Sequence, residues 1–363
     1  MTRSNPPDYV ERGGQEVWRP PYTARGANLW GFVVKASAAA VDELLQRDFV
    51  GPSRGAVNYR CVHDNVIVAF ADIAELASGD PVDSKRGHLR EREVSVWCIA
   101  ADPRARGQLV WYLPYVFADN GLAVASGREV YGYPKQAGRF EAKYPAQLVD
   151  GGTATVRALA MRGYGAGNAA ESLPMISVKR RPGGRAGTTQ TVSHIVDEIA
   201  TWFAGGFATA GPRAAGPGPR QSARILPLGA PLPAPETPAP PWVKGLLTEI
   251  EPTLAALEPL ELIVEMAANP TLAFLKQFRD ASCATKACYQ AVIESRVSML
   301  PGAKLDLLDE SRFELTLEDW SSHPLATELL GASGRTKLSP LRAFHAEFGF
   351  DVQLGDEIWR APV

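Results

Sequence analysis

The chain has 363 residues, a formal net charge of −2 and a sequence pI of about 6.3. Apolar residues make up 45% and charged residues 21%, a mixture that supplies a buried core and excludes wholesale disorder. The balanced charge argues against nucleic acid as a partner, and no apolar run reaches the ~18 residues of a membrane-spanning helix, so we expect no membrane partner and a cytoplasmic location.

The first half of the chain has mostly β patterning. Short segments rich in β-branched and aromatic residues are separated by Gly, Pro, Asp or Asn, which predicts strands over residues 29–35, 66–72, 93–99, 108–113, 139–144 and 153–159. One helix is expected between the first two strands, because Ser37 can cap it and Val41, Leu44 and Leu45 recur at helical spacing. The fold class that this pattern predicts is α+β and rich in strands.

The second half contains a change of composition. Residues 209–242 are rich in proline and glycine, so we expect a linker or a wrapping loop there and not a strand or a helix. The flanking residues 192–207 and 243–268 have helical spacing, and strand patterning returns at residues 272–278, 287–293 and 313–317. No internal repeat is evident.

Common catalytic and metal-binding motifs are missing from the sequence. The four cysteines at 61, 98, 283 and 288 form no CxxC pair and are expected to be buried, and the five histidines are scattered without an HExxH pattern. The sequence therefore gives little support for a metal site, a nucleophile elbow or a nucleotide-binding loop.

The segment EVYGYPKQ, residues 129–136, places Lys135 behind two tyrosines and a proline. A lysine nucleophile must be uncharged and held rigidly in a dry pocket. The rings of Tyr131 and Tyr133 can exclude water, which disfavours the charged ammonium and lowers its pKa, and Pro134 restricts the approach to the lysine. The alternative is an ordinary lysine in a turn after a strand.

The longer segment AVASGREVYGYPK, residues 123–135, resembles the signature of the acetoacetate decarboxylase family, in which the final lysine forms a Schiff base with a keto acid. The resemblance extends over nearly the whole chain except residues 183–270. It implies one domain formed by residues 1–182 and 271–363, with a helical and proline-rich insertion between them. Such a domain is a cone-like antiparallel β-barrel with flanking helices, assembled as a homo-oligomer and needing no metal or organic cofactor.

The resemblance also suggests residues that assist the lysine. Glu93 is the best match for the family's pocket glutamate, with Glu91 on the same strand face two residues away, and Arg25 lies near the place of an N-terminal arginine. Gln136 and Tyr133 are expected to contact the substrate. Gln136 also departs from the family, which has a second lysine at this place, so a cationic neighbour cannot lower the pKa of Lys135 and desolvation must do so. Arg128 and Glu129 are expected on opposite faces of a strand, in mainly structural roles.

The function that the resemblance implies is a Schiff-base lyase acting on a small-molecule keto acid. Decarboxylation of a β-keto acid through an iminium and an enamine on Lys135 is the main expectation. Two alternatives stay open: aldol or dehydration chemistry on a 2-keto acid with the same lysine, and a barrel that binds a small ligand without turnover.

Overall fold

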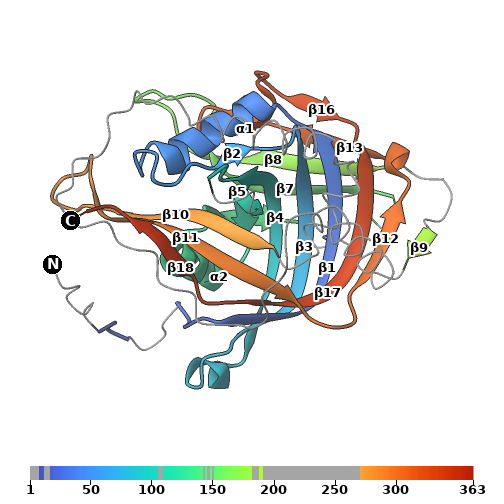
Figure 1. Cartoon of the computed structure of the whole chain (residues 1–363). Coiled ribbons are helices and arrows are strands. Elements are labelled where there is room, and N and C mark those ends of the chain that lie inside the picture. The colour runs from blue at the N-terminus through green and yellow to red at the C-terminus, as the bar shows by residue number, and fades with distance from the viewer. Residues whose placement is uncertain are drawn as a thin grey trace, which may run out of the picture.

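The computed structural model describes residues 8–11, 17–104, 109–141, 144, 148, 151–181, 188–190 and 270–362. Within them, one mixed sheet of 16 strands dominates, with a two-stranded ribbon beside it (Figure 1). The strands before the long gap are β1 Tyr22–Lys35, β2 Arg60–Cys61, β3 Asn65–Ser78, β4 His88–Ala101, β5 Leu109–Ala118, β6 Lys135–Phe140, β7 Thr153–Ala160, β8 Glu171–Arg180 and β9 Thr188–Gln190.

The strands after the gap are β10 Thr271–Arg279, β11 Ala287–Met299, β12 Lys304–Leu308, β13 Phe313–Leu317, β14 Asp319–Trp320, β15 His323–Pro324, β16 Thr336–Leu338, β17 Arg342–Val352 and β18 Asp356–Arg360. The helical elements are α1 Ala38–Leu45, α2 Gly121–Ser126, α6 Leu325–Leu330 and the single turns η1 Gln46–Val50, η2 Asp83–Arg86, η3 Gly127–Tyr131 and η5 Glu310–Arg312. Strands far outnumber helices in the described part of the chain, which confirms the strand-rich class.

Seven strands form a ring of pairings around the interior. In the order β5, β10, β11, β17, β1, β3, β4, each pairs with the next, and β4 pairs again with β5. Figure 1 shows β4, β3, β1 and β17 side by side as one wall. The pairings are mostly antiparallel, as expected, but β5 pairs in parallel with both β10 and β6. Parallel pairs need long crossovers, and the crossover from β5 to β6 contains α2 and η3.

The sheet divides at β5. One edge of β5 pairs with β4, while its other edge pairs first with β10 at Trp111 and Tyr112 and then with β6 from Val116 to Ala118. From β6 the strand order continues through β7, β8, β13 and β16 as a second part of the sheet. Lys135 is the first residue of β6 and pairs with Val116, so it lies at this division.

The core lies on both faces of the ring strands. Along β1, Phe32 belongs to the cluster that includes the buried face of α1, whereas the next residue, Val33, belongs to the cluster that includes Tyr131 and Phe274. Adjacent strand residues point to opposite faces, so a strand buried on both sides reads as a continuous apolar run such as FVV. Burial of each large apolar side chain contributes about 1.5–3 kcal/mol to the free energy of folding. The ring strands are therefore stabilised on both faces.

Most of the expected elements are confirmed. Each predicted strand except 139–144 lies within or largely overlaps an observed strand, and Ser37 caps α1 by accepting a hydrogen bond of 3.2 Å from the Ala40 amide. The predicted inward residues of α1, Val41, Leu44 and Leu45, are buried.

Three local expectations are wrong. The strand predicted at 139–144 is observed at Lys135–Phe140, because the Gly132–Pro134 turn ends before the lysine and the strand starts at once. Arg128 and Glu129, which were expected on a strand, lie in the π-helical turn η3, since Asn120 caps α2 and η3 continues that helix. Cys283 and Cys288 are exposed in the β10–β11 hairpin, so only part of the cysteine prediction holds.

Strand β8 has no counterpart in the sequence prediction. Its Pro174 lies at a register shift against β7, where a residue without an amide hydrogen can be accommodated in a strand.

The inserted segment 183–270 lies mostly outside the described residues, including the proline-rich part and both predicted helices, so its role stays a prediction. Strand β9 falls in this range and pairs with β12, and Pro270 lines the interior cavity described below. No helix in the described part of the chain is long and apolar enough to cross a bilayer.

Candidate active site

The segment before Lys135 folds as a helix, a left-handed turn and a strand. Asn120 accepts hydrogen bonds from the amides of Leu122 and Ala123 and begins α2, which continues through the π-helical turn η3. Gly132, with φ +87°, ends the helix, and β6 begins three residues later at Lys135. Arg128 donates a 3.1 Å hydrogen bond to the Lys135 carbonyl, which ties the turn to the strand.

Two glycines of this segment are required by contacts. A Cβ at Gly127 would lie 2.9 Å from Lys135 Cδ, so the glycine leaves room for the aliphatic part of the lysine. A Cβ at Gly132 would lie 2.5 Å from the Lys276 Cα on β10, and the positive φ also disfavours any other residue. Gly127 therefore leaves space for the side chain of Lys135, and Gly132 allows the turn to approach the backbone of β10.

Lys135 ends in a cluster of three charges. Its Nζ lies 2.6 Å from Glu91 Oε1 and 3.2 Å from Glu93 Oε2, and both glutamates come from the inner face of β4. Lys135 is 8% exposed and Glu91 only 1%. The predicted Lys135 and Glu93 are thus brought together, but Glu91, which sequence reasoning ranked second, is the nearer and more deeply buried carboxylate. The spacing of two residues in EREVS is the signal that places both on one face.

The electrostatics of the cluster differ from expectation. Burial lowers the pKa of Lys135, but the carboxylates of Glu91 and Glu93 outweigh this effect and raise its pKa above the ordinary value. The expected partly neutral lysine is therefore wrong for the site without substrate. Burial raises the pKa of Glu91 to about 7, against the lowering effect of Lys135 and with a further increase from Glu93. A carboxyl group with a pKa in this range can accept a proton near neutral pH.

Aromatic rings form one wall beside the amine. The Tyr133 ring lies 5.5 Å from Lys135 Nζ and packs on Phe274, with ring centroids 3.8 Å apart. Tyr131 meets Tyr133 edge-on at 5.7 Å. The structure thus places Tyr133 at the lysine, as the sequence predicted.

Lys135, Glu91 and Glu93 lie at the edge of a cavity of about 140 Å³ inside the ring of strands. An engineered apolar cavity of ~150 Å³ can bind benzene, so this space suits a small organic molecule. Most of the cavity wall is apolar, and Lys135 is the one Lys, Arg or His among the described residues that line it.

Two predicted substrate contacts are not brought into this cavity. Gln136 follows Lys135 on β6 and points to the other face, where its Oε1 lies 2.6 Å from His323 Nε2. Arg25 is exposed at a register shift of β1 between Ala24 and Ala27, where the bulge turns it out of the alternating pattern. Neither residue lines the cavity, so neither expected contact is supported.

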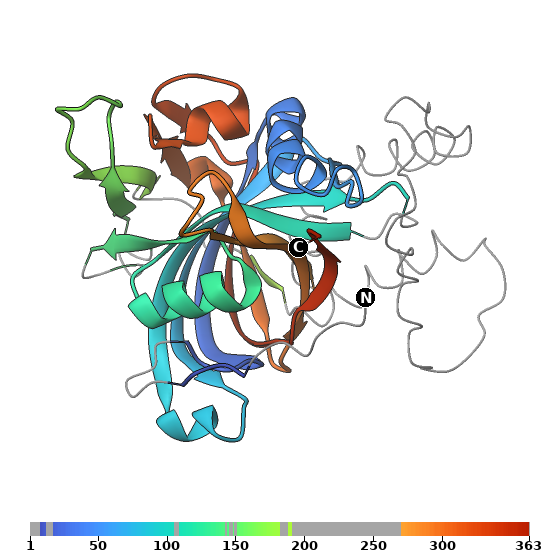
Figure 2. The same ribbon diagram turned by 90° about the vertical axis from the view of Figure 1, so that its left-hand side faces the viewer.

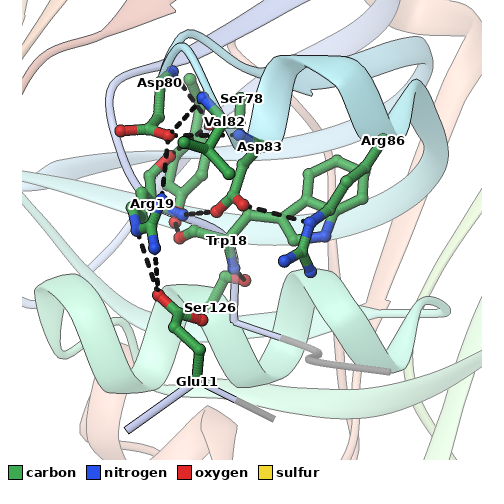
Figure 3. A network of polar contacts seen from close by, with 10 residues as sticks. Glu11, Trp18, Arg19, Ser78, Asp80, Val82, Asp83, Arg86 and Ser126 are labelled. Carbon is green, nitrogen blue, oxygen red and sulfur yellow. Dashed lines mark hydrogen bonds and ion pairs between the residues drawn. The ribbon is translucent and has the colours of Figure 1, made fainter. Parts of the chain in front are cut away.

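The segment before β1 is held in place by a network of polar contacts (Figure 3), and its Trp18 lines the cavity. The Trp18 amide donates a 3.2 Å hydrogen bond to Ser126 Oγ on α2, and the Arg19 amide donates a 2.8 Å bond to Asp83 Oδ2. Asp83 is buried in η2, in the hairpin between β3 and β4 that projects at the lower end of Figure 2. This network fixes Trp18 and Tyr22, which both line the cavity.

No cluster of three or more His, Cys, Asp or Glu side chains suited to a metal ion occurs within the described residues.

No protein-family model matches the chain, and no curated protein matches it. Among solved structures, the acetoacetate decarboxylase of Legionella pneumophila subsp. pneumophila str. Philadelphia 1 is similar with a TM-score of 0.53 at 8% identity, over 99% of this chain and 94% of that chain. Another acetoacetate decarboxylase structure has a TM-score of 0.50 at 12% identity, over 96% of this chain and 93% of that chain. The chain therefore has the acetoacetate decarboxylase-like fold that its lysine segment implies.

Proposed function

We propose that the protein is an acetoacetate decarboxylase-like lyase that forms a Schiff base between Lys135 and a β-keto acid and releases carbon dioxide. The observation that carries this proposal is the buried amine of Lys135, 2.6 Å from Glu91 and 3.2 Å from Glu93 at the edge of an apolar cavity.

The first step is to make the amine neutral. Glu91 accepts a proton from the Lys135 ammonium, which converts an ion pair into a neutral amine and a neutral carboxylic acid. Burial disfavours both charged forms, and a substrate that fills the cavity removes remaining water and shifts this balance further toward the neutral pair. The raised pKa of Glu91 makes it a competent acceptor near pH 7.

The neutral amine then attacks the ketone carbon. A carbinolamine forms, Glu91 returns its proton to the departing hydroxyl, and water leaves to give the iminium. The bond between the α-carbon and the carboxylate breaks, and its electron pair moves to the iminium nitrogen to give a neutral enamine and carbon dioxide. Glu91, which gave its proton to the departing hydroxyl, takes up a proton from solvent and protonates the enamine carbon. Hydrolysis of the resulting iminium releases the ketone and free Lys135, so the net reaction consumes one proton from solvent.

The apolar cavity favours the bond cleavage. An iminium with an attached carboxylate is a zwitterion, whereas the enamine and carbon dioxide are both neutral. A low-dielectric surrounding disfavours the zwitterion relative to the neutral products, and therefore favours the transition state in which charge disappears.

Release of carbon dioxide tests this proposal. A panel of β-keto acids is incubated with the protein, and gas release above the spontaneous background is measured together with inactivation by borohydride. We expect substrate-dependent inactivation and catalytic release of carbon dioxide. Neither effect with any member of the panel contradicts the proposal and favours a binding protein without turnover.

A second reaction with the same lysine is supported by one feature of the cavity. Once Lys135 becomes an iminium, the described cavity wall has no other cation to hold a substrate carboxylate. Loss of an α-proton instead of carbon dioxide also yields a neutral enamine, which can attack an aldehyde in an aldol reaction. Borohydride trapping without release of carbon dioxide selects this alternative.

A further inference from the structure

The inner face of β4, β3, β1 and β17 contains rows of directly paired residues that lead away from the lysine. Glu91 pairs with Ile73, Ile73 with Ala27, and Ala27 with Phe348. Residues paired across neighbouring strands point to the same face, and all four line the cavity. Three strand spacings of about 4.8 Å give this row a length of roughly 14 Å along the sheet.

The neighbouring row has the same character. Glu93 pairs with Ala71, and Ala71 with Leu29. Both rows thus begin at a carboxylate on β4, which contacts Lys135 Nζ, and continue as apolar residues across β3 and β1. Within these two rows, the charged groups stand at the β4 end only.

Side-chain size along these rows leaves a path. Ala71 on β3 and Ala27 on β1 are the small residues of the two rows. Each is paired with a larger residue, Leu29 for Ala71 and Ile73 for Ala27, so the two alanines lie diagonally across the cavity wall, and Phe348 and Phe350 on β17 stand at the far end. In the other direction the wall beside Lys135 consists of large rings, including Tyr133, which packs on Phe274. A substrate whose ketone reaches Lys135 therefore has room for a tail above the two alanines.

We propose that the substrate is a β-keto acid with an apolar tail, and that the tail lies over Ala71 and Ala27 and ends against Phe348 and Phe350. This inference rests on the proposed function and adds the substrate class to it. A tail without hydrogen-bonding groups fits because the far end of these rows offers only aliphatic and aromatic side chains. A second carboxylate or a sugar in that position is excluded by the cost of burying unpaired polar groups.

A chain-length series tests the inference. With 3-oxobutanoate, 3-oxohexanoate and 3-oxooctanoate, kcat/KM for carbon dioxide release is expected to rise about fourfold for each added methylene, the factor that corresponds to ~0.8 kcal/mol per buried CH₂. A flat or falling series, with borohydride trapping still at Lys135, overturns the apolar tail and leaves the proposed function standing. Neither carbon dioxide release nor trapping with any member overturns both.

Two variants locate the tail. Ala27→Leu narrows the path, so the ratio of kcat/KM for 3-oxooctanoate over 3-oxobutanoate should fall at least ~10-fold, as expected when several methylenes lose their place. Phe348→Ala enlarges the far end of the cavity, so the substrate with the highest kcat/KM should have a longer chain. Ala74→Leu is the matched control, because Ala74 is exposed on the same sheet and does not line the cavity.

The controls also separate misfolding from specificity. Each variant is compared with the native protein by thermal unfolding, and the ratio of two substrates is used because a loss of active protein cancels from it. Two results contradict the proposed position of the tail. One is an equal change in the kcat/KM ratio of 3-oxooctanoate over 3-oxobutanoate in Ala27→Leu and Ala74→Leu. The other is an unchanged preferred chain length in Phe348→Ala.

Discussion

Lys135 and Lys276 are two lysines next to aromatic rings, and they differ in what surrounds the amine. Lys276 on β10 is partly buried, with its Nζ 5.9 Å from the Phe278 ring centroid and 5.3 Å from that of Tyr289, and burial lowers its pKa. Lys135 is more deeply buried, and two carboxylates raise its pKa. By basicity alone, Lys276 would be the better nucleophile.

The comparison indicates that the surroundings of the amine, and not its basicity, determine which lysine can act as the nucleophile. Lys276 does not line the cavity, and Glu129 and Glu357 act on its charge without forming an ion pair with it among the described residues, so it lacks both this cavity and an acid in contact with its amine. Lys135 has the cavity, and Glu91 is in contact with its amine. A resting ammonium with an adjacent acceptor can become a nucleophile when substrate excludes water, whereas an amine of lowered pKa without an enclosed substrate site cannot select a substrate.

Replacing each lysine gives the largest expected difference. Lys135→Arg retains the positive charge between the glutamates but cannot form an imine, so turnover should fall by ~10⁴-fold or more. Lys276→Arg is the matched control and should keep activity within about twofold of native, since surface changes away from the site have small effects. Steady-state carbon dioxide release measures both. Comparable losses in the two variants would remove the distinction between the lysines.

Glu91 is expected to matter more than Glu93, because it is closer to Nζ and more buried. Glu91→Gln should lower kcat by about 10²–10⁴-fold, the usual range for loss of a general acid–base group. Glu93→Gln keeps the nearer acceptor and should lose less. A larger loss in Glu93→Gln would transfer the proton-accepting role to that residue.

The pH profile sharpens the assignment to Glu91. With a raised pKa of about 7, Glu91 is protonated below that pH and cannot accept the Lys135 proton. We therefore expect kcat/KM to fall tenfold per pH unit as pH decreases below about 7, and this acid limb should disappear in Glu91→Gln. An unchanged acid limb in the variant would mean that another group titrates.

Alanine substitutions at two glycines of the same helical segment test whether contact with Gly127 positions the Lys135 side chain. Gly127→Ala places a Cβ 2.9 Å from Lys135 Cδ and should displace the amine, lowering kcat by ~10-fold to 10²-fold. Gly121→Ala adds a methyl group with nothing within 4 Å and should leave kcat unchanged. If both variants have native kcat, contact with Gly127 does not position the lysine.

The smallest effect is expected at Gln136. Its side chain faces His323 on the opposite side of β6, so Gln136→Ala should alter kcat/KM by less than about threefold, while loss of the hydrogen bond lowers the free energy of unfolding by ~1 kcal/mol. Kinetics and urea unfolding measure the two quantities. A strong change of substrate preference without a change in the free energy of unfolding would indicate that Gln136 contacts the substrate.

Sequence reasoning located most of the longer strands before residue 318, because their apolar and β-branched runs reflect burial on both faces, as in FVV of β1, but it predicted no strand for β17. It missed β8, since Pro174 is compatible with a strand only at the register shift that the partner β7 provides. It also missed the helical state of residues 121–131, where a local cap at Asn120 decides between conformations that hydrophobic spacing does not distinguish.

At the site, the motif identified Lys135 and the strand period placed two glutamates on one face. The ranking of Glu91 below Glu93 was wrong in geometry, because which of two same-face carboxylates meets the amine depends on the register between β4, β5 and β6. Arg25 and Gln136 were misplaced for similar reasons. A bulge in β1 turns the first outward, and strand alternation turns the second to the face opposite Lys135.

Peptide mapping of the borohydride-reduced adduct tests the central claim most directly. The protein is incubated at pH 7 with 3-oxobutanoate and borohydride, digested, and the modified lysine is identified by mass spectrometry, with Lys276 in the same digest as the internal comparison. The account predicts a single substrate-dependent adduct on Lys135 and none on Lys276. An adduct on Lys276, or equal labelling of several lysines, would contradict it.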